Sequence, residues 1–170
     1  NYTHPLLAAA TAEALSARWN DTWPNFSTSD QVMHHGSEQA GLALFGDLLP
    51  ALLAGERISL RHRVESGRIL PPHGVNDPEL YGAITVKTAE KLEAARPDSK
   101  RVYSMAVTAT SERQGGQPSS WSSAVDSFCA GETDGKRRIL VVAAGNNREL
   151  LPNPHYWDQS ALCEIEDPAQ

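Results

Sequence analysis

The chain has 170 residues, of which 40% are hydrophobic and 21% charged, and this composition is typical of one globular domain spanning residues 1–170. Its formal net charge of −6, without a long basic run, argues against nucleic acid as a partner. No apolar run reaches the ~18 residues that a membrane span needs, so we expect no membrane partner.

Two helices are predicted in the first third of the chain. Residues 5–19 carry helically spaced apolar side chains behind Pro5, which suits a first turn. A longer helix begins near His35 with one apolar side, and Pro50 is expected to kink or end it. Gly41 lies inside this helix at a cost of about 1 kcal/mol relative to alanine. We therefore expect the helix to approach another backbone closely at Gly41.

Strands and helices alternate over the rest of the chain. The predicted elements are strands over 57–64 and 68–70, a helix over 77–95, a buried strand over 101–108, a helix that opens at Pro118 and Ser119, and a strand over 138–144. Apolar and small residues run without interruption through the last strand, which is typical of a strand covered on both faces. The alternation predicts an α/β domain with a mainly parallel sheet.

Two short segments carry residues suited to catalysis. His35 opens a predicted helix, where the positive end of the helix dipole favours the neutral imidazole that a general base needs. Asn146 follows a predicted strand, and catalytic groups of parallel sheets gather at the carboxyl ends of strands. Each residue also has an ordinary interpretation: His34 and His35 as the polar start of a helix, and Asn146 as a left-handed turn residue. The two segments together favour a base and an oxyanion donor.

These segments resemble two motifs of subtilisin-like serine peptidases, His-Gly-Thr-x-x-Ala-Gly and Ala-Gly-Asn. They read His35-Gly36-Ser37-Glu38-Gln39-Ala40-Gly41 and Val141-Val142-Ala143-Ala144-Gly145-Asn146-Asn147. Between them, residues 102–108 are similar to the family's substrate-pairing strand, and residues 124–126 to an Ala-Val-Asp on a family helix. The resemblance covers roughly residues 1–147. It implies an incomplete three-layer subtilisin-like α/β fold, with helices on both faces of a mainly parallel sheet.

The resemblance also implies roles for particular residues. His35 would be the catalytic base, Asn146 the oxyanion donor, and Ala106, Val107 and Thr108 the lining of the non-primed substrate subsites. Two positions depart from the family pattern. Ser37 replaces the usual threonine, and Thr108 replaces a glycine, which adds a β-branched side chain beside the S1 entrance.

Two of the family's catalytic motifs are absent from the 170 residues, the Asp-Thr-Gly of the acid and the Gly-Thr-Ser-x-Ala of the nucleophile. In bacterial relatives the acid motif runs into a segment similar to residues 1–7, which implies an acid just upstream and a nucleophile beyond residue 170. Asp21 and Asp30 lie in loops without that context, and the serines of 119–123 are interpreted as helix-cap residues. The chain is thus expected to be an inactive internal fragment of a serine endopeptidase domain, with peptides or proteins as substrates. An open sheet edge left by the missing acid-bearing strand would favour a homodimer.

Other functions remain open beside the peptidase. A non-catalytic domain of the same fold would bind a peptide or scaffold a partner, and a Gly-Thr-Ser-x-Ala elsewhere in the protein would decide between the two. The six histidines show no His-x-x-x-His and the cysteines no Cys-x-x-Cys, so we expect no metal and no cofactor. A nucleotide-binding domain would need a P-loop or a Gly-x-Gly-x-x-Gly, and neither is present.

The cysteines and the first residue leave the cellular compartment open. Cys129 falls on the apolar face of a predicted helix and is interpreted as a small buried hydrophobe; a bridge to Cys163 fits the sequence without being required. The chain begins at Asn1 without a methionine, so a natural start upstream also fits.

Overall fold

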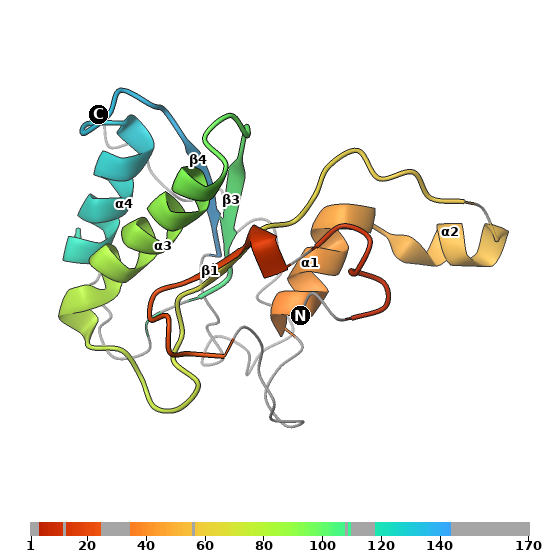
Figure 1. The fold of residues 1–170 in the computed structure, drawn as a ribbon, viewed down its shortest axis with the longest axis horizontal. Coiled ribbons are helices and arrows are strands. Elements are labelled where there is room, and N and C mark those ends of the chain that lie inside the picture. Colours follow the sequence, from red (N-terminus) through yellow and green to blue (C-terminus); the bar gives the residue numbers. More distant parts are fainter. Residues whose placement is uncertain are drawn as a thin grey trace, which may run out of the picture.

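A computed structural model describes residues 4–11, 13–24, 35–55, 57–107, 109 and 118–143 of the chain. Its elements are, in order, η1 (Glu13–Leu15), β1 (Ser16–Arg18), α1 (His35–Phe45), α2 (Leu48–Ala54), β2 (Ser66–Arg68), η2 (Pro78–Leu80), α3 (Tyr81–Ala95), β3 (Val102–Met105), α4 (Ser120–Ala130) and β4 (Ile139–Val142) (Figure 1). The predicted alternation of helix and strand from α1 to β4 is confirmed. Within these ranges no helix has the length and apolar character needed to cross a bilayer.

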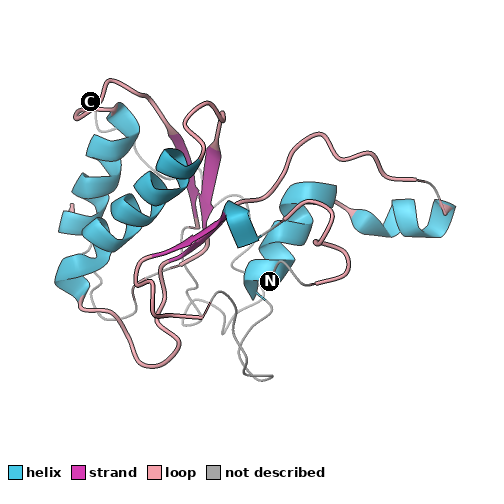
Figure 2. Cartoon of the chain, viewed as in Figure 1, coloured by secondary structure: helices cyan, strands magenta, loops and turns pink. Residues whose placement is uncertain are grey.

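The strands form two parallel pairs, which confirms the α/β class. β1 pairs with β2 from Ser16↔Ser66 to Arg18↔Arg68. β3 pairs with β4 from Val102↔Ile139 to Met105↔Val142. Parallel strands need a crossover connection, and α1 with α2 lies in the first crossover and α4 in the second. Figure 2 shows the strands in the middle of the described chain, with α3 and α4 together on one side.

The cap predicted at Asp77 begins η2, which leads into α3 at Tyr81, and the cap predicted at Ser119 begins α4; the two helices pack closely against each other. The Asp77 carboxylate accepts a hydrogen bond from the Glu79 backbone at the start of η2, and Ser119 forms a capping box with Ser122 at the start of α4. At the crossing, a Cβ added to Gly82 would lie 2.7 Å from the Cβ of Ala124, so this glycine permits the close approach. Ile84, Thr88 and Leu92 share one face of α3 at helical spacing and are buried.

Helix α1 packs against the segments that precede β1 and β2. Its Leu44 forms a small core with Leu7 and Ala10, and the surrounding half-buried hydrophobic residues are Ala40, Phe45, Leu60 and Val64. The Val64 backbone N–H donates to the Ala10 carbonyl at 3.0 Å and joins the two segments just before their strands. The C-terminal half of α1 is therefore anchored near the amino-terminal ends of β1 and β2.

The predicted helix over residues 5–19 is wrong. Residues 5–10 form turns whose backbone bonds run from Leu7 and Ala8 to His4 and from Ala10 and Thr11 to Leu7. The chain then passes through η1 into β1. Pairing with β2 makes residues 16–18 a strand, because a tertiary ladder overrides the weak preference that apolar spacing expresses.

The long predicted helix is interrupted before Pro50. Gly46 has a φ of +61°, and Asp47 then caps α2 by accepting a hydrogen bond from the Leu49 backbone at 3.1 Å. Pro50 falls in the first turn of α2, where a missing N–H is tolerated. The close approach expected at Gly41 is not found among the described residues, where a Cβ would meet nothing within 4 Å.

One face of the β3–β4 pair is exposed in the described chain, whereas a buried strand over 101–108 and a strand covered on both faces over 138–144 were predicted. Val102 is 68% exposed, Ile139 63% and Val141 57%, and strand alternation places these three on one face of the β3–β4 pair. Of the described elements, α3 and α4 cover the other face. The strands predicted over 57–64 and 68–70 reduce to β2, since the segment before it makes no ladder within the described chain.

Candidate functional site

The proposed base, His35, is the first residue of α1, as its sequence context predicts. Its side chain is half-exposed, and Nδ1 lies 3.7 Å from Oε2 of Glu38 one turn later. Glu38 sits in the first turn, where a carboxylate interacts favourably with the helix dipole. The imidazole therefore lies at the N-terminus of α1, and the C-terminal half of this helix is packed in the core.

The direction of α1 sets where that imidazole lies. Leu44, nine positions after His35, is buried beside the segments that lead into β1 and β2, so the core contact and the imidazole are separated by about 14 Å along the helix axis. In Figure 1 the first turn of α1 lies low in the view, on the side toward which β3 and β4 run.

The other predicted site residues follow β3 and β4. The two strands end side by side at Met105 and Val142, and the Ala143 backbone N–H donates to the Met105 carbonyl at 3.1 Å. Ala106 and Val107 continue directly from β3 and are half-buried. Thr108 and Asn146 lie outside the described residues. The predicted subsite segment and the start of the segment that leads to Asn146 therefore lie together at the carboxyl ends of β3 and β4.

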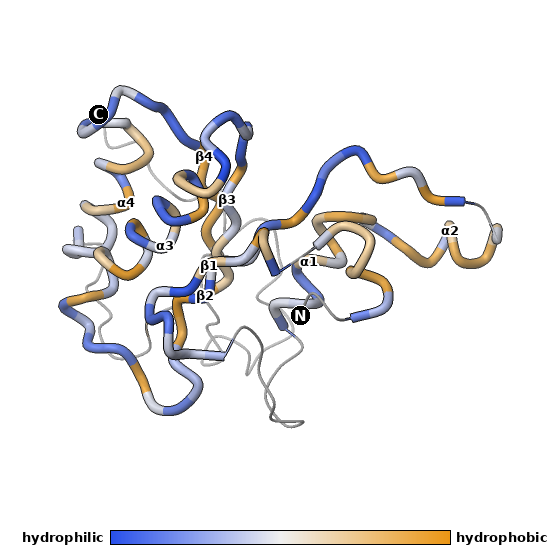
Figure 3. Tube along the Cα trace, in the orientation of Figure 1, coloured by the Kyte–Doolittle hydropathy of each residue, from blue (hydrophilic) through white to orange (hydrophobic). Residues whose placement is uncertain are grey.

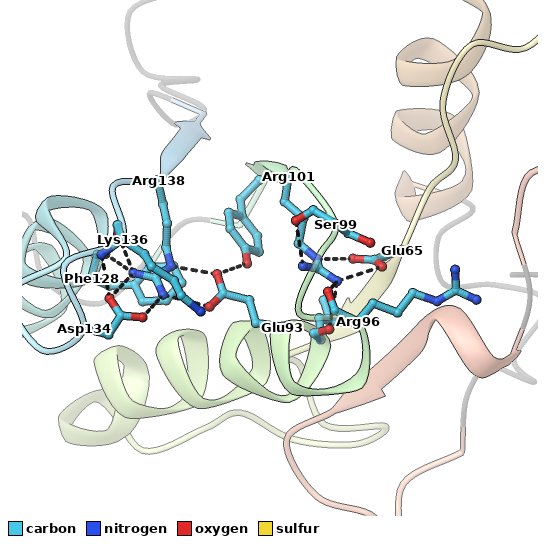
Figure 4. Close-up of polar contacts among 11 residues, drawn as sticks. Glu65, Glu93, Arg96, Ser99, Arg101, Phe128, Asp134, Lys136 and Arg138 are labelled. Carbon is cyan, nitrogen blue, oxygen red and sulfur yellow. Dashed lines mark hydrogen bonds and ion pairs between the residues drawn. The ribbon is translucent and has the colours of Figure 1, made fainter.

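A polar network at the opposite, amino-terminal ends of these strands was not predicted from the sequence. The Tyr103 hydroxyl donates to Oε1 of Glu93 at 2.7 Å, and Arg138 donates from Nε and Nη2 to the two Glu93 oxygens, each at 2.7 Å (Figure 4). The Arg138 side chain is only 7% exposed. We call Glu93, Tyr103, Arg138 and Asp134 the Glu93 network.

Charge and burial perturb the groups of the Glu93 network in opposite directions. The hydrogen bond from Arg138 lowers the pKa of the Glu93 carboxyl, and burial followed by the Glu93 hydrogen bond raises the pKa of the Tyr103 hydroxyl. Arg138 also holds the pKa of Asp134 at about 2 through hydrogen bonds of 2.6 and 3.1 Å. The carboxylates therefore stay ionised and Tyr103 stays protonated around neutral pH.

Arg138 has further partners that fix its orientation. Its Nη1 donates to the carbonyls of Phe128 at 3.1 Å and Lys136 at 2.7 Å, and the guanidinium lies 4.3 Å from the centre of the Phe128 ring. A second pair, Arg101 with Glu65, precedes β3 and β2, and Arg101 also donates to the Leu92 carbonyl at 3.0 Å. Both arginines stand immediately before a strand. From the sequence alone, an arginine at such a position would be expected to point into solvent.

Other residues considered from the sequence have structural roles. Asp21 accepts a hydrogen bond from Lys91 at 3.0 Å, and Lys91 also donates to the Arg18 and Trp19 carbonyls, so this group fixes the loop after β1. Ser119 and Ser122 cap α4, as predicted. Cys129 is a free, half-buried thiol whose pKa is raised mainly by burial, and Cys163 lies outside the described residues. In the described ranges no group of three potential ligands is arranged to hold a metal ion.

Comparison with known proteins bears on the same motifs. A model of the subtilase family, peptidase family S8, matches residues 1–170. Comparisons with curated proteins and with solved structures give no significant match. The match extends over the whole chain and so includes the His35 segment, the parallel strands and the Asn146 segment. The chain therefore belongs to the subtilase family.

Proposed function

We propose that this chain is the base-bearing and oxyanion-bearing part of a serine endopeptidase domain that cleaves peptide bonds. The family match over all 170 residues carries the proposal. The alternation of α1, β2, α3, β3, α4 and β4 supports it, because it follows the order of elements that the subtilase resemblance implies. The finer, three-layer arrangement with helices on both faces belongs to the same proposal.

In the proposed reaction, His35 takes the proton from a serine hydroxyl as that oxygen attacks the scissile carbonyl carbon. The developing oxyanion accepts a hydrogen bond from the Asn146 amide. His35 then gives its proton to the leaving amine, and water hydrolyses the acyl-enzyme by the same steps in reverse order. The serine and the acid that orients His35 have no matching motif within the 170 residues, so we propose that these residues alone do not hydrolyse peptides.

Ala106, Val107 and Thr108 would receive the substrate on the non-primed side. They follow β3, which pairs with β4 on one side and with no other strand in the described part of the chain. A peptide can add to such an edge through main-chain hydrogen bonds, with its side chains read by pockets. The β-branched Thr108 would narrow the S1 entrance relative to glycine.

The test is labelling with a fluorophosphonate probe, which reacts with activated serines. We expect the natural full-length protein to be labelled, its His35→Ala variant to be labelled far more slowly, and the isolated 170-residue chain not to be labelled. A folded full-length protein that stays unlabelled would contradict the peptidase proposal.

The alternative is a non-catalytic peptidase-like domain that binds a peptide or scaffolds a partner. Its support is the lack of acid and nucleophile motifs in the 170 residues. The same labelling experiment separates the two, because a binding domain would bind peptide in a calorimetric titration while leaving the probe unreacted.

A further inference from the structure

We propose that Glu93 is a positioning residue, whose carboxylate holds the substrate strand and the oxyanion strand in register from the far end of the sheet. The inference rests on the proposed function, since it assigns subsites to the segment after β3 and the oxyanion donor to the segment after β4. Glu93 itself touches neither substrate nor reacting atoms.

The geometry joins three elements at one carboxylate. Tyr103 is the second residue of β3, and Arg138 stands immediately before β4. Both donate to Oε1 of Glu93 at 2.7 Å, and Arg138 also reaches Oε2 at 2.7 Å. Because Glu93 is fixed on α3, a slip of either strand along the other would break at least one of these bonds. Figure 4 shows the Glu93 carboxylate pointing toward Arg138, with dashed lines marking its hydrogen bonds.

The link is rigid because the Arg138 guanidinium at its centre is enclosed. The Arg138 side chain is 7% exposed and is further bound by Asp134 and by the carbonyls of Phe128 and Lys136. Removing one partner from an enclosed ion pair leaves the other charge without compensation, and the surrounding groups then shift to satisfy it. By contrast, Lys87 and Glu90 on the same helix form an exposed pair at 3.0 Å, of the kind that contributes little.

The effect would reach the site along the strands. Three positions separate Tyr103 from Ala106, and Val142, the end of β4, lies four positions before Asn146. Short strands transmit a displacement at one end to the other. A misplacement of about 1 Å at reacting groups lowers rates by roughly 100-fold, even when the mutation is far from the chemistry.

The experiment uses the natural full-length protein with active sites counted by fluorophosphonate titration, and it measures kcat and KM per active site on peptide substrates. Tyr103→Phe removes only the β3 bond, so we expect KM to rise several-fold with kcat within about twofold. Glu93→Gln keeps an acceptor for Tyr103 but loses the charge that holds Arg138, so we expect kcat to fall about tenfold with a smaller change in KM. Glu90→Gln, the matched control on α3, should leave both constants unchanged.

A purely structural role predicts a different result. It would lower the number of titratable sites and leave kcat and KM per site at their wild-type values in both variants, which would overturn the positioning role. Tyr103→Phe removes one oxygen and keeps the test decisive if Glu93→Gln does not fold. A wild-type protein that is not labelled at all would instead overturn the proposed function, and this inference with it.

Discussion

Thr88 combines a buried polar atom with tight packing. It lies buried on α3 beneath β2, its hydroxyl has no hydrogen-bond partner in the described chain, and a Cβ on Gly67 would lie 3.1 Å from its methyl group. A buried hydroxyl without a partner costs about 1–3 kcal/mol. The position needs the shape of a β-branched side chain rather than its polarity.

Thr88→Val should therefore increase the free energy of unfolding by about 1 kcal/mol, because it keeps the shape and removes the unpaired oxygen. Urea denaturation followed by circular dichroism measures this. The matched control is Thr85→Val on the same helix, whose hydroxyl accepts from Trp121 at 3.0 Å and donates to the Tyr81 carbonyl at 2.8 Å. That control should destabilise by about 1 kcal/mol; equal effects at the two positions would contradict the reasoning.

Gly131 and Gly135, which follow α4, have the same left-handed backbone conformation but differ in the space around them. Gly131 has a φ of +73° and Gly135 a φ of +72°, but a Cβ on Gly131 would lie 2.6 Å from the Lys136 carbonyl oxygen, whereas one on Gly135 would meet nothing within 4 Å among the described atoms. Gly135→Ala should cost about 1–2 kcal/mol, the ordinary penalty of the left-handed region. Gly131→Ala should cost more, and thermal melting of the two variants would reveal the difference.

At the scale of elements, α3 organises the described chain. It packs on α4 through Gly82, buries Ile84 and Leu92 toward the strands, and binds β3 and the start of β4 through Glu93. Trp121 of α4 adds a hydrogen bond to Thr85 and a ring contact with Tyr81 at 5.1 Å. The strands therefore depend on α3 for their relative position.

The carboxylates of the Glu93 network make the free energy of unfolding depend on pH. Both network carboxyls have lowered pKa values in the folded chain, with Asp134 at about 2, and an unfolded Asp or Glu titrates near 4. Their contribution is therefore complete above about pH 5 and is lost as pH falls through the folded pKa values. We expect the free energy of unfolding to fall between about pH 4.5 and pH 2. Glu93→Gln should make that decline shallower; an unchanged slope would show that the network is not responsible.

For the described chain as a whole, two apolar surfaces stand out. One is the open face of β3 and β4, where Val102, Ile139 and Val141 are exposed. The other is α2, which projects away from the strands and is hydrophobic along its length (Figure 3), with Leu53 79% exposed. Unpaired strand edges and exposed apolar faces promote association.

We expect the isolated 170-residue chain to self-associate through the exposed apolar face of the β3–β4 pair. Val141→Lys should then shift sedimentation profiles toward the monomer. Leu53→Lys is the control on α2 and should have little effect. Association relieved by Leu53→Lys and not by Val141→Lys would assign the contact to α2 instead.

Local signals account for most of the correct predictions. Asp77 with Pro78 and Ser119 with Ser122 begin their helices through contacts within three residues, so the printed sequence contains everything those caps require. α1 also begins at His35, as predicted. Thr108 and Asn146 lie outside the described residues, so their predicted roles remain predictions.

The sequence by itself determined the family motifs, the alternation of helix and strand after His35, and the caps at Asp77 and Ser119, because each of these depends on neighbouring residues. Only the tertiary structure decided that residues 16–18 form a strand, because their partners lie at 66–68. It alone joined Arg138 to Glu93, 45 residues away, on an element that nothing in the local pattern connects with it. Strand ladders and enclosed ion pairs depend on which segments meet in space, and that is settled when the helices pack.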